Sequence, residues 1–399
     1  MHSKIHELAF HEYQKPIYAL MYTSEYIITG GADNMIVVWS HKFEYITTLT
    51  RHTTPVMILR RLNETHFISA SDDGHCLVWQ KSEDQEQSLF VPCQSFMKSQ
   101  TIADICVYEP YVLIATISTI YIHQYIEQIH KLDFTGKLIQ GVCLDPIDKI
   151  ITVQFSDGGI RHMIPKSTKK YNEIKVSKRC VGDFNRMIFR KSQWLPDGSG
   201  CLAVAGYTHT DVEATTKSNS CLLFSRTYLE EPLCTFGTPL KQVTCVVIYP
   251  IPMKLVNKST SLLGLPYRYI FAALSTDGLQ LWDTEHLKPI MTAKGFHYAN
   301  LTDAIFIPSK LHKWESNLSD EEMIKFVVAS ADGFISEFQF EASEFGTAYE
   351  IGTEEWLQQP MKVWQNPDFN GEKFKQTKTE KVVMQIKKKN EQGEMVVIQ

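Results

Sequence analysis

The sequence predicts an all-β fold: a seven-bladed β-propeller closed by its N-terminal strand and followed by a flexible, polar C-terminal tail. One phrase recurs along the chain, made of small residues, an aspartate in a turn, and an apolar run that ends in an aromatic residue. Its four clear copies carry the pairs Asp33 and Trp39, Asp73 and Trp79, Asp277 and Trp282, and Asp332 and Phe338, and a weaker copy surrounds Asp157. Repeated strand–turn–strand phrases in units of about 40–45 residues are typical of a propeller.

The composition fits a single folded body with no strong overall field. The chain has 399 residues, 44% of them hydrophobic and 21% charged, and its formal net charge is −5. Such a charge does not draw a protein onto nucleic acid or an anionic membrane. No apolar run approaches the roughly 18 residues of a membrane-spanning helix. Nine cysteines are scattered without close pairs, which indicates reduced and mostly buried thiols. We expect no membrane association and no sequence-specific nucleic-acid binding.

The first three blades follow from alternating strands and turn residues. Blade one spans roughly residues 15–48, and blade two begins at Arg51 and turns at Asp73 and Gly74. In such a turn the aspartate caps backbone N–H groups and the glycine accepts a positive φ. Blade three has strand-like runs at 102–107 and 112–116, but the aspartate phrase is absent between them and the next strand. We therefore interpret blade three as degraded.

Four further blades follow in order. Blade four starts near Lys137, and the turn 194–198 marks blade five. Blade six has strands at 243–249 and 269–274, and blade seven has strands at 301–307 and 326–329. Blade seven is one strand short, because the repeated pattern ends after Phe340.

The N-terminal segment is predicted to complete the ring. Residues 4–10 have strand character, and their pairing with blade seven would leave no open sheet edge. We assign the propeller to residues 4–345 and a C-terminal extension to residues 346–399. Lysine, glutamate, glutamine and asparagine dominate the end of the chain, so we expect it to be largely disordered after about residue 366.

The repeated phrase also predicts a structural network. In propeller repeats of this type, His52, Ser69, Asp73 and Trp79 would form one buried hydrogen-bonded chain, which holds the strands only if each polar member has a partner. The equivalent members in other blades are Asp33, Trp39, Asp277, Trp282, His297 and Asp332. A hairpin turn itself requires one aspartate per blade, so we interpret these residues as structural.

Signatures of catalysis are missing from the sequence. It contains no Gly-rich phosphate loop, no His-Glu-x-x-His helix and no Gly-x-Ser-x-Gly elbow. His52 and His297 have no neighbours at the spacing of metal ligands. We predict a protein that is not an enzyme, with no catalytic, cofactor-binding or metal-binding residues.

The second half of the chain carries more specific phrases, which lie at 189–198, 223–226, 265–272, 281–284 and 296–303. Their order and spacing resemble the WD-repeat middle subunit of chromatin assembly factor one, the replication-coupled histone chaperone. The Leu-Pro-Tyr-Arg entry at 265–268 and the His-Tyr…Leu-Thr-Asp phrase at 297–303 do not belong to the general propeller consensus. The resemblance covers roughly residues 4–345 and is weaker toward the start.

The resemblance implies a non-catalytic scaffold in the nucleus. It implies binding to the large acidic subunit of a chromatin assembly complex and a part in depositing histones H3 and H4 onto newly replicated DNA, with histone contact made directly or through the complex. Members of the family often carry a basic C-terminal motif for a chaperone of the anti-silencing-function-one type. The tail here offers only residues 382–389 in its place, so that contact stays open.

Long insertions between strands are the expected partner surfaces, and they lie at 81–92, 166–179, 207–219, 251–266 and 309–325. The candidate partner-binding residues are Glu83, Asp84, Glu86, Lys169, Lys170, Tyr267 and Arg268. The lysine-rich stretch 166–179 could touch DNA phosphate, but it lacks aromatic residues for base stacking, so a solvated loop between blades is favoured. The acidic loop could meet a basic histone segment, although solvation alone is the commoner role.

Two other functions stay open. A replication-independent chaperone of the HIR type carries a related propeller, and a generic WD-repeat adaptor would share the fold. The phrases at 265–272 and 296–303 argue against the generic adaptor, because propeller geometry does not require them. An enzyme is the least supported alternative.

Overall fold

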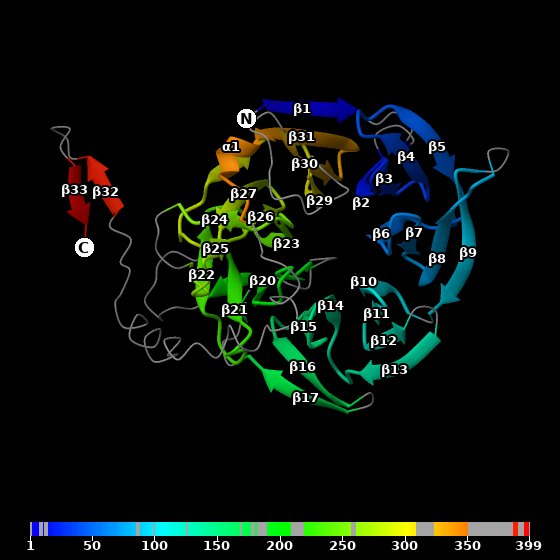
Figure 1. Ribbon diagram of the computed structural model, residues 1–399, viewed down its shortest axis with the longest axis horizontal. Helices are drawn as coiled ribbons and strands as arrows, with labels where there is room; N and C mark the ends of the chain where they lie inside the picture. Colours follow the sequence, from blue (N-terminus) through cyan, green and yellow to red (C-terminus); the bar gives the residue numbers. More distant parts are fainter. Residues whose placement is uncertain are drawn as a thin grey trace. The chain divides into compact units, whose positions relative to one another are not determined.

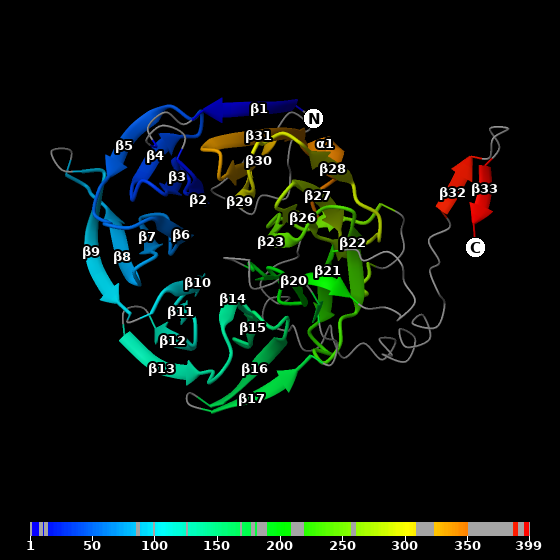
Figure 2. The same cartoon turned by 180° about the vertical axis from the view of Figure 1, so that it is seen from behind.

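The computed structural model describes residues 2–7, 11, 15–84, 88–98, 100–124, 127–167, 170–176, 180–181, 190–208, 219–256, 261–308, 323–349, 386–389 and 395–398. The chain divides into two compact units, Met1–Thr353 and Glu354–Gln399. In the first unit, seven antiparallel sheets surround a central axis, as Figure 1 and, from behind, Figure 2 show. The prediction of an all-β, seven-bladed propeller is therefore confirmed.

The first three blades are consecutive four-stranded sheets in which each strand pairs with the next. Blade one contains β2 (Ile17–Tyr22), β3 (Tyr26–Gly31), β4 (Ile36–Ser40) and β5 (Tyr45–Leu49). Blade two contains β6 (Val56–Arg61), β7 (His66–Ser71), β8 (His75–Lys81) and β9 (Phe90–Met97). Blade three contains β10 (Ile102–Tyr108), β11 (Tyr111–Thr116), β12 (Thr119–Gln124) and β13 (Glu127–Asp133). Blade three keeps four strands although its turn lacks the aspartate phrase.

The next three blades keep this plan with additions. Blade four contains β14 (Ile139–Leu144), β15 (Ile151–Phe155), β16 (Ile160–Ser167) and β17 (Lys170–Lys175). In blade five, β20 (Gly200–Thr208) pairs with β18 (Cys180–Val181), β19 (Gln193–Trp194) and β21 (Asn219–Ser225), and β22 (Cys234–Thr238) is outermost. Blade six contains β23 (Val243–Ile248), β26 (Ile270–Ser275), β27 (Gly278–Asp283) and β28 (Met291–Lys294). A small hairpin, β24 (Met253–Lys254) with β25 (Tyr267–Arg268), interrupts blade six.

The N-terminal strand closes the ring. Blade seven contains β29 (Leu301–Ile307), β30 (Met323–Ser330) and β31 (Phe334–Glu341), and its fourth strand is β1 (His2–Glu7). The antiparallel register pairs His2 with Gln339 at one end and Glu7 with Phe334 at the other. The predicted closure is confirmed, and it leaves β31 without an exposed edge. A short helix, α1 (Ala342–Phe345), follows β31.

Apolar side chains from facing sheets fill the contacts between blades. Between blades one and two, Phe67 stacks on Trp79 with ring centroids 5.8 Å apart, and Phe90 packs edge-on against Phe67 at 5.1 Å. Some backbones approach too closely for any side chain. A Cβ on Gly141 of blade four would lie 1.9 Å from the Arg190 carbonyl oxygen, so only glycine fits there. Neighbouring blades therefore pack directly against each other at these two places.

One predicted insertion is a strand. The stretch 166–179 was expected to be a loop between blades, but β16 runs to Ser167 and β17 supplies the outer strand of blade four. In β17 only Tyr171 and Ile174 are half-buried, and the other residues are exposed. An outer strand needs few apolar residues because most of its surface faces water. Its composition therefore resembles that of a loop.

The second unit is described by one strand pair. β32 (Ile386–Lys389) pairs antiparallel with β33 (Met395–Ile398). The expected disorder after about residue 366 falls mostly outside the described residues, so it stays a prediction. Among the helices of the described part, none is both long enough and apolar enough to cross a membrane.

Candidate interaction surface

Blade two holds the predicted hydrogen-bonded chain with one additional member. His52 Nε2 lies 2.6 Å from Ser69 Oγ, and Trp79 Nε1 donates to the same oxygen at 2.8 Å. His52 does not meet Asp73 directly: its Nδ1 lies 3.1 Å from Ser71 Oγ, which donates to Asp73 Oδ1 at 2.6 Å. Asp73 itself is exposed rather than buried. The expectation of a fully buried chain was wrong at this end, because Ser71 spans the distance to the surface turn.

Burial lowers the pKa of the histidine in this hydrogen-bonded network. Burial, followed by the effect of nearby His75, lowers the pKa of His52 from 6.5 to about 4. The imidazole is therefore neutral at physiological pH and can donate through one nitrogen and accept through the other. This suits a group that lies between two hydroxyls.

Blade one contains the same arrangement around a histidine that the sequence analysis missed. His11 Nδ1 lies 2.9 Å from Asp33 Oδ2, and His11 Nε2 lies 2.6 Å from Thr29 Oγ1. Trp39 Nε1 donates to Thr29 Oγ1 at 2.9 Å. His11 precedes the aspartate phrase of blade one at nearly the spacing of His52 in blade two, which is the signal that could have revealed it.

Blade seven lacks two members of the hydrogen-bonded network, the strand hydroxyl and the tryptophan. His297 Nδ1 lies 3.0 Å from Asp332 Oδ2, but its Nε2 meets Ser336 Oγ at 2.9 Å. Val328 occupies the strand position of the missing hydroxyl and lies opposite Ser336 in the register, and Phe338 stands where an indole would donate. Blade seven has no indole N–H that needs an acceptor, so the hydroxyl that contacts the histidine can come from Ser336 on the neighbouring strand, β31. Burial lowers the pKa of His297, although Asp332 opposes this effect.

In blade six the predicted members, Asp277 and Trp282, do not share a hydrogen-bonded network. Asp277 Oδ1 accepts from Ser275 Oγ at 2.9 Å and from the Lys241 backbone N–H at 2.8 Å. Trp282 packs edge-on against Phe236, with ring centroids 5.3 Å apart. Ala273 takes the hydroxyl position, so it offers no acceptor to the indole.

The sheet registers identify the equivalent of this tryptophan in every blade, in chain order Trp39, Trp79, His123, Met163, Phe224, Trp282 and Phe338. His162 of blade four is fully buried, and burial lowers its pKa to about 3. Its Nδ1 lies 3.0 Å from Thr152 Oγ1, which also accepts from Trp194 Nε1 of blade five at 3.0 Å. This network joins two blades and was not predicted.

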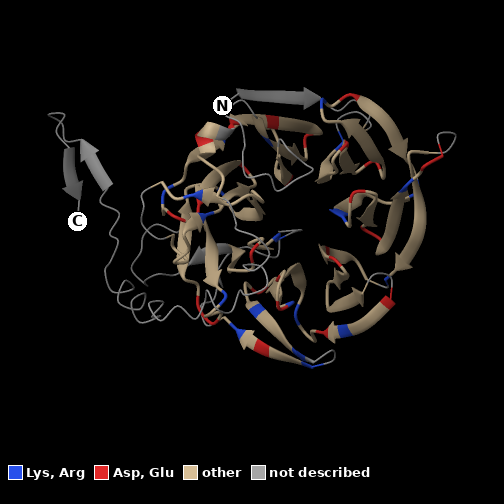
Figure 3. Cartoon of the chain, viewed as in Figure 1, with Lys and Arg blue, Asp and Glu red and all other residues tan. Residues whose placement is uncertain are grey.

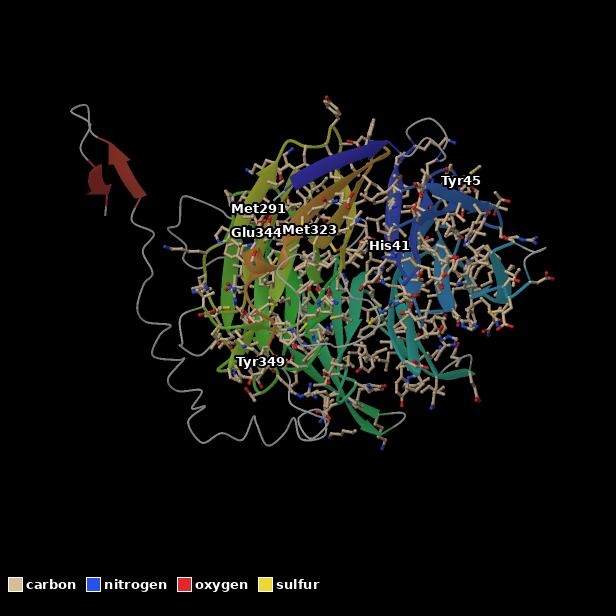
Figure 4. All side chains as sticks on the ribbon, turned by 45° about the horizontal axis from the view of Figure 1, so that its top comes forward. His41, Tyr45, Met291, Met323, Glu344 and Tyr349 are labelled. Carbon is tan, nitrogen blue, oxygen red and sulfur yellow. The ribbon has the colours of Figure 1, made fainter. Side chains whose placement is uncertain are left out.

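The predicted contact residues Tyr267 and Arg268 lie in β25 and are buried. The Tyr267 hydroxyl donates to Asp197 Oδ2 of blade five at 2.6 Å, and its ring lies 5.0 Å from that of Tyr349, which Figure 4 labels. Arg268 pairs with Asp283 and donates to the Phe345 carbonyl oxygen at 2.9 Å. Their placement in a partner-binding loop was wrong, because both side chains tie the β24–β25 hairpin to its surroundings.

Three nearby groups lie close enough together to hold a cation. Ligand atoms of Asp283, Glu285 and His286 are within 4.8 Å of one another. The Arg268 guanidinium pairs with Asp283 and lies 3.7 Å from Glu285, so a protein cation already contacts both carboxylates. The cluster is an ion-pair network within blade six, with both carboxylates buried and His286 half-buried.

The other predicted contact residues are divided between described and undescribed parts. Glu83 and Asp84 are exposed between β8 and β9, and Lys170 is exposed at the start of β17. Glu86 and Lys169 lie outside the described residues. Over the described blades, Lys and Arg are interspersed with Asp and Glu, as Figure 3 shows.

The inner strands of all seven blades line a central cavity of about 550 Å³. Asp104 of blade three accepts from Arg60 of blade two at 2.9 Å and from the Val142 N–H of blade four at 3.1 Å. Asp303 of blade seven lies 2.8 Å from Lys191 Nζ and accepts from the Leu20 N–H of blade one at 3.0 Å.

These aspartates therefore form polar links between blades, with their charges paired. The sequence analysis missed this role, although both aspartates are the third residue of an inner strand, in β10 and β29. Cys106 and Cys245 also line the cavity, and burial raises the pKa of each thiol to about 12. Protonated thiols are poor nucleophiles.

The sequence is similar to known proteins both in its repeats and over most of its length. The family "WD domain, G-beta repeat" matches residues 2–40 and 43–80. A chromatin assembly factor 1 subunit FAS2 homolog from Oryza sativa is 25% identical over 88% of this chain and 75% of its own length. A chromatin assembly factor 1 subunit from Gallus gallus is 24% identical over 85% of this chain and 68% of its own length. The chain is homologous to this subunit of chromatin assembly factor 1.

This homology covers most of the chain, as the phrases in its second half led us to expect. Protein HIR1 from Candida albicans is also similar, with 23% identity over 75% of this chain but only 34% of its own length. The chain therefore matches a smaller share of HIR1 than of the two chromatin assembly factor 1 subunits.

Proposed function

We propose that the chain is the propeller scaffold of a nuclear complex like chromatin assembly factor 1, and that it supports replication-coupled deposition of histones H3 and H4 without catalysing a reaction. The similarity to the FAS2 homolog carries the proposal, because it spans 88% of this chain and 75% of that relative. A match confined to repeats would cover the turns and strand ends but not the insertions. A large part of both proteins corresponds instead.

The geometry supports a holding role. Paired charges in the central cavity and hydrogen bonds between blades make a rigid body, and the outer strands and connecting loops are the surfaces left for partners. The partners we propose are the large subunit of the complex and histones H3 and H4, contacted directly or through that subunit. The tail is a second surface, proposed for a chaperone of the anti-silencing-function-one type.

Affinity purification of the tagged full chain from nuclease-treated nuclear extract tests the proposal. We expect mass spectrometry to recover a large acidic subunit together with histones H3 and H4, and nuclease treatment prevents bridging by DNA. A chain missing the residues after Asn366 should still recover the large subunit but lose a chaperone bound by the tail. Recovery of neither the large subunit nor histones would reject the proposal.

A replication-independent chaperone subunit is the second candidate, and its support is the similarity to HIR1. The two candidates differ in timing. Cofractionation of the chain with the replication clamp during DNA synthesis favours the first candidate, whereas association with chromatin outside DNA synthesis favours the second.

A further inference from the structure

A cavity of about 290 Å³ lies between blades two and three. Strands β7, β8 and β9 of blade two supply one wall, and β10, β11 and β12 of blade three supply the other. Its lining is mainly apolar and includes Ile68, Val78, Phe96, Val112 and Ile114. Cavities of this kind stay dry and bind apolar groups when they are accessible.

The cavity exists because blade three lacks two aromatic rings. In blade two, Phe67 pairs with Trp79 across the strands, and the stacked rings fill the contact with blade one. The equivalent pair in blade three is Val112 with His123, and both line the cavity. A branched aliphatic chain and an imidazole fill less space than a phenyl ring and an indole. The missing volume is therefore aromatic in shape.

Aromatic side chains line the cavity and can pack against a ring inserted into it. His123 packs edge-on against Phe96 of blade two with centroids 5.1 Å apart, and Tyr111 lines the same wall as His123. Aromatic pairs in such offset or edge-on arrangements are favoured beyond their buried area. These neighbours select an aromatic occupant over an aliphatic one.

The mouth of the cavity carries one negative charge. Glu109 is exposed in the turn between β10 and β11, and it is the only Asp, Glu, Lys or Arg among the described residues that line the cavity. Lining residues also come from β9, which is the outermost strand of its sheet. An edge strand can receive an extended peptide, with pockets beside it providing specificity.

We propose that this cavity is a docking site for an extended segment of a partner protein, which inserts an aromatic side chain between blades two and three and places a basic residue beside Glu109. The aromatic ring takes the space that Phe67 and Trp79 occupy in the preceding blade contact. The basic residue meets the one ionised side chain at the mouth. The inference stands apart from the proposed function, since it concerns the isolated chain.

Short synthetic peptides test the site directly. The probe is a six-residue peptide with arginine–tryptophan–arginine at its centre, compared with one carrying alanine for tryptophan and one carrying glutamates for the arginines. Cys93 lines the cavity and is exposed, so its rate of alkylation, followed by mass spectrometry, reports occupancy. We expect the first peptide to slow alkylation of Cys93 severalfold at saturation, and the other two to bind about tenfold more weakly or worse.

Substitutions in the full chain locate the effect. His123→Trp and, separately, Val112→Phe should fill the cavity and abolish protection by the first peptide, with folding checked by circular dichroism. Glu109→Lys should reverse the preference, so that the glutamate peptide protects better. Glu230→Lys, the same charge reversal at an exposed site in blade five, should change neither result.

Glu109→Lys tests whether the peptide binds at this cavity even if both cavity-filling variants fail to fold. Equal protection by the arginine and glutamate peptides, protection by free indole alone, or full protection in a folded His123→Trp chain would each overturn the proposal. Failure of the first peptide to slow alkylation would do the same. None of these outcomes depends on recovery of a chromatin complex.

Discussion

One strand position shows how single residues set the properties of whole blades. Where blade two places Val78 and blade five Leu223, blade four places His162, which is fully buried and contacts Thr152 at 3.0 Å. A histidine at this position brings a titratable group into the contact between blades four and five. The cost of charging that group belongs to the folded state alone, because the unfolded chain exposes it to water.

Acid should therefore weaken the propeller through His162. Burial lowers the pKa of His162 to about 3 in the folded state, while the unfolded chain takes up a proton near 6.5. The stability due to the neutral form is complete above pH 6.5 and is lost as pH falls toward 3. At pH 5 the loss from this one group is about 2 kcal/mol. His52, with its pKa lowered to about 4, adds a loss of the same sign as pH falls from 6.5 toward 4.

The variant His162→Phe tests this contribution, because it removes the titratable group and keeps an aromatic ring at this position. Urea titration at pH 7 and at pH 5 measures how far the free energy of unfolding falls between the two pH values. We expect this fall to be about 2 kcal/mol smaller in His162→Phe than in the parent chain. The variant Phe224→His, which adds a second histidine beside His162 in the same contact, should steepen the dependence. An unchanged difference between the two pH values in His162→Phe would contradict the role given to His162.

At the scale of elements, the sequence predicted strands that bury both faces and missed strands that bury little. The inner and middle strands of blades six and seven follow from apolar runs and the aspartate turns at Asp277 and Asp332. The outer strand β17 resembled a loop, because water covers most of it. The hairpin β24–β25 was missed because two-residue strands have no periodicity to detect. It is held instead by side-chain contacts of Tyr267 and Arg268.

The N-terminal strand offers a test at the same scale. Deleting residues 2–7 removes the partner of β31 along its whole register, so the ring opens and the amides of β31 become exposed. We expect the melting temperature to fall by roughly 5 °C or more and hydrogen exchange in β31 to accelerate. A synthetic peptide of residues 2–7 added in trans should restore both. Unchanged exchange in β31 after the deletion would show that the seam does not depend on β1.

At the scale of the molecule, two aspartates each join three blades. Asp104 connects blades two, three and four, and Asp303 connects blades five, seven and one. The number of blades and the closing strand could be predicted because each depends on local pattern and on the need to cover a sheet edge. These links could not, because they arise only when inner strands from across the chain converge. The same is true of the cavity beside His123, which depends on a comparison between neighbouring blades.

The end of the folded body can be located by two truncations. The Lys254 N–H donates to the Thr347 carbonyl oxygen at 2.8 Å, and the Tyr349 N–H donates to the Pro252 carbonyl oxygen at 2.8 Å. These contacts lie beyond residue 345, the boundary expected from composition. We predict that removing the residues after Asn366 leaves the melting temperature within about 2 °C of the full chain, whereas ending the chain at Phe345 lowers it by about 5 °C.

The difference arises because the shorter chain loses the backbone pairing with blade six, and Tyr267 loses the ring of Tyr349. Differential scanning fluorimetry of the three chains, with circular dichroism to confirm the β-rich fold, measures both effects. A large drop on removal of the residues after Asn366 would mean that the distal tail supports the propeller. Equal stability of the two shortened chains would mean that residues 346–349 contribute nothing to it, and the folded body would then end with α1.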